Sequence, residues 1–160
     1  MTSAATDLAD VIPAGAGLLV DTSATLAYVA GTESASPAAT EIFDAFLATG
    51  RNVGYLSMVS VGELLVRPFR AGPAAIATIE GLLRHFAEIR LVDVTYEIAR
   101  EAARLRAASD LRMPDALIIA TALEEKVDVL VTNDRSWPAA LTSVAPGLQV
   151  CVLSDVIPAR

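Results

Sequence analysis

The chain alternates short apolar runs with longer segments in which apolar residues recur at helical spacing. Buried strands are predicted at the short runs, which are residues 18–20, 53–56, 89–94, 129–131 and 149–153. Helices are expected at 22–29, 38–48, 59–66, 73–86, 95–108 and 114–126, with Gly50 capping the second and Pro68 stopping the third. Strands and helices in alternation predict parallel strands joined by right-handed crossovers. The expected fold class is therefore α/β, a three-layer α/β/α sandwich with a mostly parallel sheet.

The first residues of the chain lack this regularity, because Pro13, Gly15 and Gly17 interrupt any pattern there. We predict a loose N-terminal lead-in over residues 1–16 and a single domain over residues 17–160. A length of 160 residues suits one domain with a full hydrophobic core, and 54% hydrophobic residues exclude a disordered chain.

Composition narrows the cellular setting and the available chemistry. No apolar run approaches the roughly 20 residues that span a bilayer, and residues 1–10 contain no Lys or Arg to begin a signal peptide. We therefore expect a cytoplasmic protein without membrane contact. The single cysteine, Cys151, is predicted to be a buried, inert thiol. The single histidine, His85, is predicted to be a half-buried packing residue on an apolar helix.

The net charge of −7 does not favour a nucleic-acid binder, since phosphate is usually neutralised by a basic surface. The excess acid is either an ordinary solvated surface or partly concentrated in one site, where bound cations reverse the local sign.

Four acids fall where a parallel sheet binds ligands, beyond the carboxyl ends of its strands. Asp21 directly follows the first predicted strand, and Asp134 comes shortly after the fourth. Glu63 lies early in the helix after the second strand, and Asp115 lies at the start of the last predicted helix. Four carboxylates gathered without a cation would repel one another, whereas Mg²⁺ or Mn²⁺ prefers such oxygen ligands.

Each acid also has an ordinary structural explanation. Asp21 would cap the following helix, Asp115 would be favoured by the helix dipole, and Asp134 would belong to a turn. Glu63 would extend from the rim of an apolar helix face. One such explanation is easy to accept, but four at the same edge of the sheet favour a metal site.

Four segments resemble the PIN-domain family, above all the VapC-type toxins of bacterial toxin–antitoxin pairs. They are residues 18–23 (LLVDTS), 57–64 (SMVSVGEL), 112–118 (RMPDALI) and 131–137 (VTNDRSW). The resemblance covers about residues 17–153, with the segments in the family's order. Trp137 stands where the family often has Phe, a departure that concerns packing.

The resemblance implies a ribonuclease that cleaves single-stranded RNA with Mg²⁺ or Mn²⁺. It further implies the toxin of a type II toxin–antitoxin pair, inhibited by a small antitoxin protein, and a homodimer. Asp21, Glu63, Asp115 and Asp134 would be the catalytic, metal-binding quartet.

Ser23 and Thr132 are the further candidates for supporting or contacting the substrate. Arg112 and Arg135 flank two of the acids and are candidates for pairing with RNA phosphate, although ordinary salt bridges or a solvated position explain each of them nearly as well. Hydrolysis would use water activated by one ion, with a second ion at the leaving oxygen, and would leave 5′-phosphate and 3′-hydroxyl ends. Two apolar helix faces, residues 76–83 and 43–47, are expected to be core, a dimer interface or an antitoxin groove.

Two other classes of protein remain open. A non-catalytic PIN-like binding module would keep the fold without turnover. A Mg²⁺-binding phosphotransfer or receiver domain would need a lysine at a strand end, but Lys126, the only lysine, precedes its strand. A haloacid-dehalogenase-like phosphatase would need a second Asp where Ser23 stands.

Overall fold

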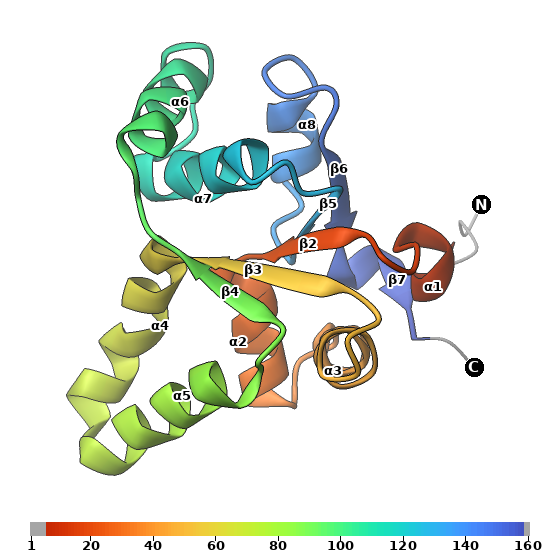
Figure 1. Ribbon diagram of the computed structural model, residues 1–160, viewed down its shortest axis with the longest axis vertical. Helices are drawn as coiled ribbons and strands as arrows, with labels where there is room; N and C mark the ends of the chain where they lie inside the picture. The colour runs from red at the N-terminus through yellow and green to blue at the C-terminus, as the bar shows by residue number, and fades with distance from the viewer. Residues whose placement is uncertain (1–5, 159–160) are drawn as a thin grey trace.

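A computed structural model describes residues 6–158, in which a central parallel sheet lies between two sets of helices (Figure 1). The five strands lie in the order β4-β3-β2-β5-β6. Their bounds are β2 (Gly17–Val20), β3 (Val53–Ser57), β4 (Ile89–Val92), β5 (Val129–Thr132) and β6 (Gln149–Val152). The chain moves outward from β2 to β4 and then returns to the other side of β2, so the strand order reverses between β2 and β5. The predicted α/β class and three-layer sandwich are confirmed.

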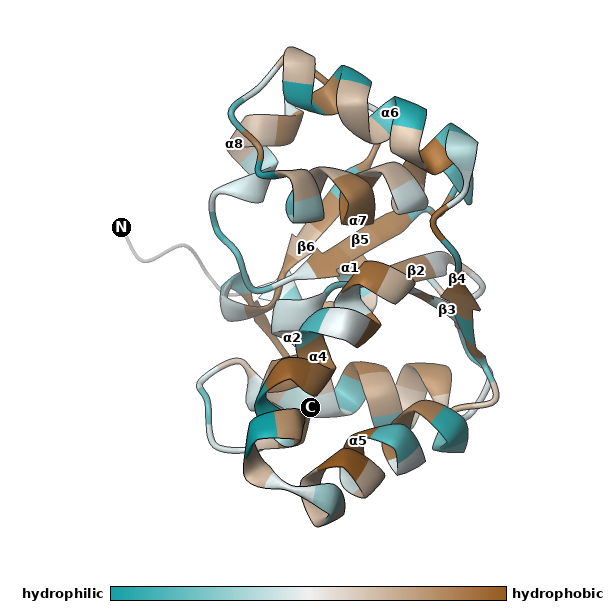
Figure 2. Ribbon diagram, turned by 90° about the vertical axis from the view of Figure 1, so that its left-hand side faces the viewer, coloured by the Kyte–Doolittle hydropathy of each residue, from teal (hydrophilic) through white to brown (hydrophobic). Residues whose placement is uncertain are grey.

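Helices cover both faces of this sheet (Figures 1 and 2). On one side lie α2 (Thr22–Ala30), α3 (Ser36–Thr40), the π-helix η1 (Glu41–Leu47), α4 (Met58–Ala71) and α5 (Pro73–His85). On the other side lie α6 (Tyr96–Ala107), α7 (Met113–Glu124) and α8 (Trp137–Leu141). Alternate strand residues serve the two cores: Leu18 and Val20 pack with α2 and η1, whereas Leu19 packs with α6 and α7.

The two ends of the described chain meet. Strand β1 (Thr6–Asp7) pairs in parallel with β7 (Val156–Ile157), which follows the 3₁₀ turn η2 (Leu153–Asp155). Helix α1 (Leu8–Val11) begins at Asp7, whose carboxylate accepts from the backbone N–H of Ala9 (2.9 Å). Leu8 and Ile12 are fully buried, so the prediction of a loose lead-in is wrong for residues 6–12. Residues 1–5 of that lead-in lie outside the described residues.

Two helix predictions need correction. Pro68 does not stop α4, which continues to Ala71. The proline removes one helical hydrogen bond, but its ring is buried and its carbonyl accepts from Gly72 N–H (2.9 Å). The helix predicted at 38–48 is instead α3 followed by η1. Gly50 ends this segment in the left-handed region (φ 73°), with its N–H donating to the carbonyl of Leu47 (3.0 Å).

The surroundings of the single cysteine and the single histidine test the predictions made for them. Cys151 is fully buried as predicted, and burial raises the pKa of its thiol to about 12. His85 is exposed at the end of α5 with its ring edge against Phe86, so the prediction of a half-buried histidine is wrong. Among the helices of residues 6–158, none has the length and apolar character to cross a membrane.

Candidate active site

The first candidate acid, Asp21, lies at the point where the strand order reverses. It follows β2 directly and caps α2, because its Oδ1 accepts from the backbone N–H of Ala24 (2.8 Å). Its own N–H donates to the carbonyl of Val131 on β5 (3.0 Å), which fixes the backbone across the switch point. The residue is only 3% exposed, so its carboxylate is held inside the protein at the sheet edge.

Two hydroxyl groups surround this carboxylate. Ser23 Oγ lies within hydrogen-bond distance of both Asp21 oxygens (2.8 and 2.9 Å), and Thr132 Oγ1 donates to Oδ2 (2.6 Å). Each hydroxyl oxygen also accepts a backbone N–H from the loop after β5, Ser23 from Asn133 (2.8 Å) and Thr132 from Asp134 (3.0 Å). The same hydroxyls therefore orient Asp21 and fix the loop that carries Asp134.

Burial raises the pKa of Asp21 from 3.8 to about 6. Hydrogen bonds from Thr132, Ala24 and Ser23 oppose this rise, and the negative charge of Asp134 adds to it. A buried carboxylate without a neighbouring positive charge is costly to ionise. A cation beside Asp21 would therefore be favourable.

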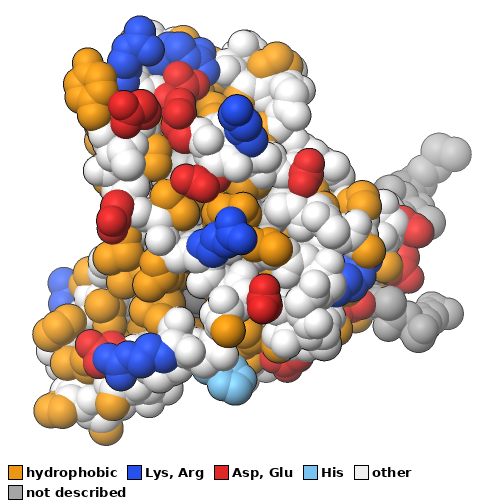
Figure 3. Space-filling view, viewed as in Figure 1, with side chains coloured by type: hydrophobic (Ala, Val, Ile, Leu, Met, Phe, Trp, Pro, Cys, Tyr) orange, Lys and Arg blue, Asp and Glu red, His pale blue; other side chains and the backbone are white. Residues whose placement is uncertain are grey.

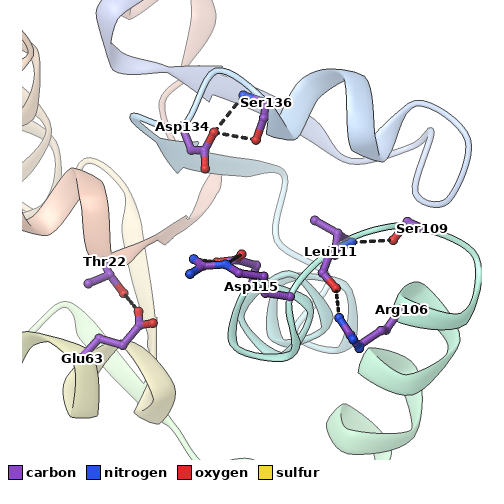
Figure 4. Close-up of polar contacts among 9 residues, drawn as sticks. Thr22, Glu63, Arg106, Ser109, Leu111, Asp115, Asp134 and Ser136 are labelled. Carbon is purple, nitrogen blue, oxygen red and sulfur yellow. Dashed lines mark hydrogen bonds and ion pairs between the residues drawn. The ribbon is translucent and has the colours of Figure 1, made fainter.

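The second acid, Glu63, lies on the α4 side of the cleft, across from the end of β2. It is exposed on α4, and its Oε2 accepts from Thr22 Oγ1 at the start of α2 (2.5 Å; Figure 4). This bond joins α4 to the helix that Asp21 caps. Sequence reasoning missed Thr22, for which the only available signal was its place directly after Asp21.

The last two acids are held by residues near them in the chain. Asp115 forms an ion pair with Arg112 through two contacts, Nε to Oδ2 (3.0 Å) and Nη2 to Oδ1 (3.3 Å). Asp134 Oδ1 accepts from the N–H (2.8 Å) and the hydroxyl (2.6 Å) of Ser136. Figure 4 shows Glu63, Asp115 and Asp134 on three separate parts of the fold around one open space.

The four predicted acids line a single cleft of about 440 Å³. Trp137 and three arginines also line it, and these arginines are Arg67, Arg70 and Arg112. Arg135, predicted beside the acids, instead bonds to Ser154 (3.0 Å) and Asp155 (2.9 Å). Arg67 and Arg70 were missed by sequence reasoning, because a helix pattern does not show which exposed residues border a cleft.

The chemistry of the cleft suits a divalent cation, although its side chains are not gathered around one. Across residues 6–158, no three acidic, histidine or cysteine side chains stand close enough together to hold a metal ion. Glu63, Asp115 and Asp134 are instead turned to partners on the cleft wall. The donors are nevertheless all carboxylate oxygens, which Mg²⁺ and Mn²⁺ prefer, and Asp21 is a buried one. The residues therefore fit such an ion by donor type and location, after rotation of the side chains of Glu63, Asp115 and Asp134.

Comparison with known proteins agrees with the family resemblance and with the fold. A family model described as PIN domain matches residues 18–140. The fold is similar to a toxin–antitoxin complex from Klebsiella pneumoniae, with a TM-score of 0.63 and 19% identity over 87% of this chain and 99% of that chain. It is also similar to VapBC2 from Rickettsia felis, solved with a DNA fragment from the promoter (TM-score 0.62, 17% identity, 85% of this chain and 98% of that one).

A third similar structure is VapC20 from Mycobacterium tuberculosis, a toxin that cleaves the sarcin–ricin loop. Its TM-score is 0.61 and its identity 22%, over 77% of this chain and 94% of that chain. No curated protein matches the chain. At these identities the structural similarity establishes the fold alone.

Proposed function

The chain belongs to the PIN-domain family, and from that premise we propose that it is a metal-dependent endoribonuclease acting on single-stranded RNA. The observation that carries the proposal is the convergence of Asp21, Glu63, Asp115 and Asp134, far apart in the chain, on one cleft. The cleft lies where the strand order of the sheet reverses, which is the usual ligand site of such sheets.

In this proposal the four acids hold Mg²⁺ or Mn²⁺. A divalent cation supplies a water of lowered pKa and offsets negative charge on the phosphate under attack. Ser23 and Thr132 keep Asp21 ionised and oriented, and Thr22 holds Glu63 at the rim. We expect 5′-phosphate and 3′-hydroxyl products, since water and not the ribose 2′-hydroxyl attacks the phosphodiester.

Cleavage of an end-labelled single-stranded RNA tests the proposal directly. Cleavage is expected with Mg²⁺ or Mn²⁺, and it should stop with EDTA and in Asp21→Asn. Asp110→Asn is the matched control, because Asp110 is an exposed acid that does not line the cleft. Metal binding without cleavage of any RNA would favour the non-catalytic binding module. Labelling of an Asp by acetyl phosphate would favour the receiver domain.

We further propose that the chain is the toxin of a toxin–antitoxin pair, as its similarity in fold to toxin–antitoxin complexes suggests. An apolar groove of about 560 Å³ runs between α2, α4 and α5, with Val29, Pro68 and Ile79 among its lining residues. It adjoins the acidic cleft, because Leu26 and Leu64 line both. An antitoxin segment in this groove would reach the cleft. Co-expression with the neighbouring small gene product should relieve any growth arrest, whereas a harmless, folded chain would contradict the toxin assignment.

A homodimer is supported by the apolar side of α4 and β4. Strand β4 is an edge of the sheet and exposes Leu91 (46%), and Phe69 (68%) on α4 is a further exposed apolar side chain. Figure 3 shows hydrophobic side chains gathered over α4 and the end of β4. Exposed apolar patches of this kind commonly mark protein interfaces. Light scattering should give a dimer mass, and Phe69→Glu should give a folded monomer.

A further inference from the structure

We propose that Arg67 and Arg70 on α4 bind backbone phosphates of the RNA and lead the strand away from the carboxylates along that helix. The inference rests on the proposed function, because it takes RNA as the substrate. It assigns to α4 a role in holding the substrate in addition to its role in carrying Glu63.

The three charged residues share one face of α4. Residues four and seven positions apart lie above one another on a helix, so Arg67 and Arg70 follow Glu63 along one line. At 1.5 Å per residue, they lie about 6 and about 10.5 Å from Glu63 along the helix axis. All three side chains are exposed, and all three line the cleft. A strand with one phosphate near the acids would therefore pass both arginines.

These two arginines are also the uncommitted positive charges of the cleft. Arg112 is bound to Asp115, and Arg135 is bound to Asp155 outside the cleft. Within residues 6–158, Arg67 and Arg70 have neither an ion pair nor a side-chain hydrogen bond. A chain of net charge −7 must hold a polyanion through local positive charge, and a free guanidinium matches a phosphate with two parallel hydrogen bonds.

The position of Arg70 favours RNA over a protein partner. Arg67 lines both the acidic cleft and the apolar groove, whereas Arg70 lines the cleft and is absent from the groove. The part of a partner protein that lies in the groove would meet Arg67, and the partner would meet Arg70 only by continuing into the cleft. A nucleic-acid strand in the cleft would meet both.

The test measures binding apart from cleavage. In an Asp21→Asn background, binding of a fluorescein-labelled oligouridylate in EDTA is followed by anisotropy at several salt concentrations. Arg67→Gln and Arg70→Gln are each expected to weaken binding roughly fivefold and to lower the slope of log K against log salt by about 0.7, the value for one single-strand phosphate contact. Arg84→Gln is the matched control, since Arg84 is an exposed arginine of α5 outside the cleft. Arg67→Lys should retain the salt slope, because it keeps the charge.

Unchanged affinity and salt slope in both glutamine variants, with unfolding midpoints like the parent's, would overturn the inference. It would also be overturned if the variants lost only the binding of the antitoxin, which would assign the arginines to a protein partner. The nuclease proposal is judged separately, by cleavage with the unaltered chain. Arginine-dependent RNA binding without any cleavage would support this inference while counting against the nuclease.

Discussion

The two walls of the cleft are built in different ways. The wall at β2 and β5 is buried and heavily hydrogen-bonded, with Asp21 held by Ser23, Thr132 and a backbone N–H. The wall at α4 is exposed. Within residues 6–158, Glu63 has one hydrogen-bond partner, Thr22 at the start of α2, and the exposed Arg67 and Arg70 have none. The first wall is organised before any ligand arrives, and the second is free to adapt to one. We expect the first to determine the rate of the reaction and the second to determine how substrate is held.

The largest loss of cleavage is expected from removing the Asp21 charge from the buried wall at β2 and β5. Asp21→Asn keeps an oxygen for the Ala24 N–H but loses a carboxylate from the cleft. Cleavage should fall by more than about a hundredfold, because residues that merely support a metal ligand already contribute ten- to a hundredfold. Initial rates on a labelled RNA at saturating Mg²⁺ measure this. Activity near that of the unaltered chain would show that Asp21 is only a helix cap.

The same residue should make the metal-free protein depend on pH. The folded-state pKa of Asp21 is about 6, above its ordinary 3.8, so the folded chain binds this proton more tightly than the unfolded chain does. The carboxyl's contribution to stability is therefore complete below pH 3.8 and is lost as pH rises to about 6. The loss is on the order of 3 kcal/mol. Urea unfolding in EDTA measures this loss as the pH-dependent difference in free energy of unfolding between the unaltered chain and Asp21→Asn.

That comparison has a clear failing outcome. If the difference in free energy of unfolding between the two chains stays constant from pH 3.8 to about 6, burial does not raise the pKa of Asp21. Added Mg²⁺ should stabilise the unaltered chain more than Asp21→Asn, since the cation offsets the buried charge.

A smaller loss of cleavage is expected from removing a hydroxyl group of the buried wall at β2 and β5. Thr132→Val removes the bond to Asp21 Oδ2 and also the acceptor for the Asp134 N–H, while keeping the side-chain shape. Because supporting residues of this kind contribute ten- to a hundredfold, cleavage should fall by about tenfold or more. Thr121→Val is the control, a buried threonine on α7 that does not line the cleft. Equal losses in the two variants would assign the effect to packing.

The smallest change in cleavage should come from a substitution at the exposed wall at α4. Thr22→Val removes the one hydrogen bond to Glu63, which lies among exposed groups and is worth about 1 kcal/mol. A change of about fivefold, mainly in KM, should therefore follow. A loss as large as that of Asp21→Asn would show that α4 is as rigidly organised as the sheet edge, and the contrast between the walls would not hold.

Much of the fold followed from local pattern. Apolar runs such as Leu18–Val20 identified the strands, and each candidate acid could be placed because it stood next to a predicted element. The Arg112–Asp115 ion pair spans a single helical turn and was open to prediction as an ordinary salt bridge. The Arg135–Asp155 pair was not, because it joins segments that meet only in the folded chain.

The errors share a physical cause, which is that tertiary contacts overrode local preference. Pro68 stays inside α4 because its ring is buried, and the segment at Leu8 is ordered because its side chain fills the core. A sequence likewise does not show that Arg67 and Arg70 lack ion pairs, because that depends on which acidic side chains lie near them in the folded chain. Candidate chemistry was therefore easier to predict than the residues that we propose to hold the substrate.

The pairing of β1 with β7 has a consequence for how the protein is made. Thr6 pairs with Val156, so during synthesis β1 has no partner until the distant segment that forms β7 has left the ribosome. Contacts between such distant parts of a chain form slowly. Leu8 and Ile12 remain without their final surroundings during that interval, so this part of the core cannot close until residues near β7, such as Leu153, have been made.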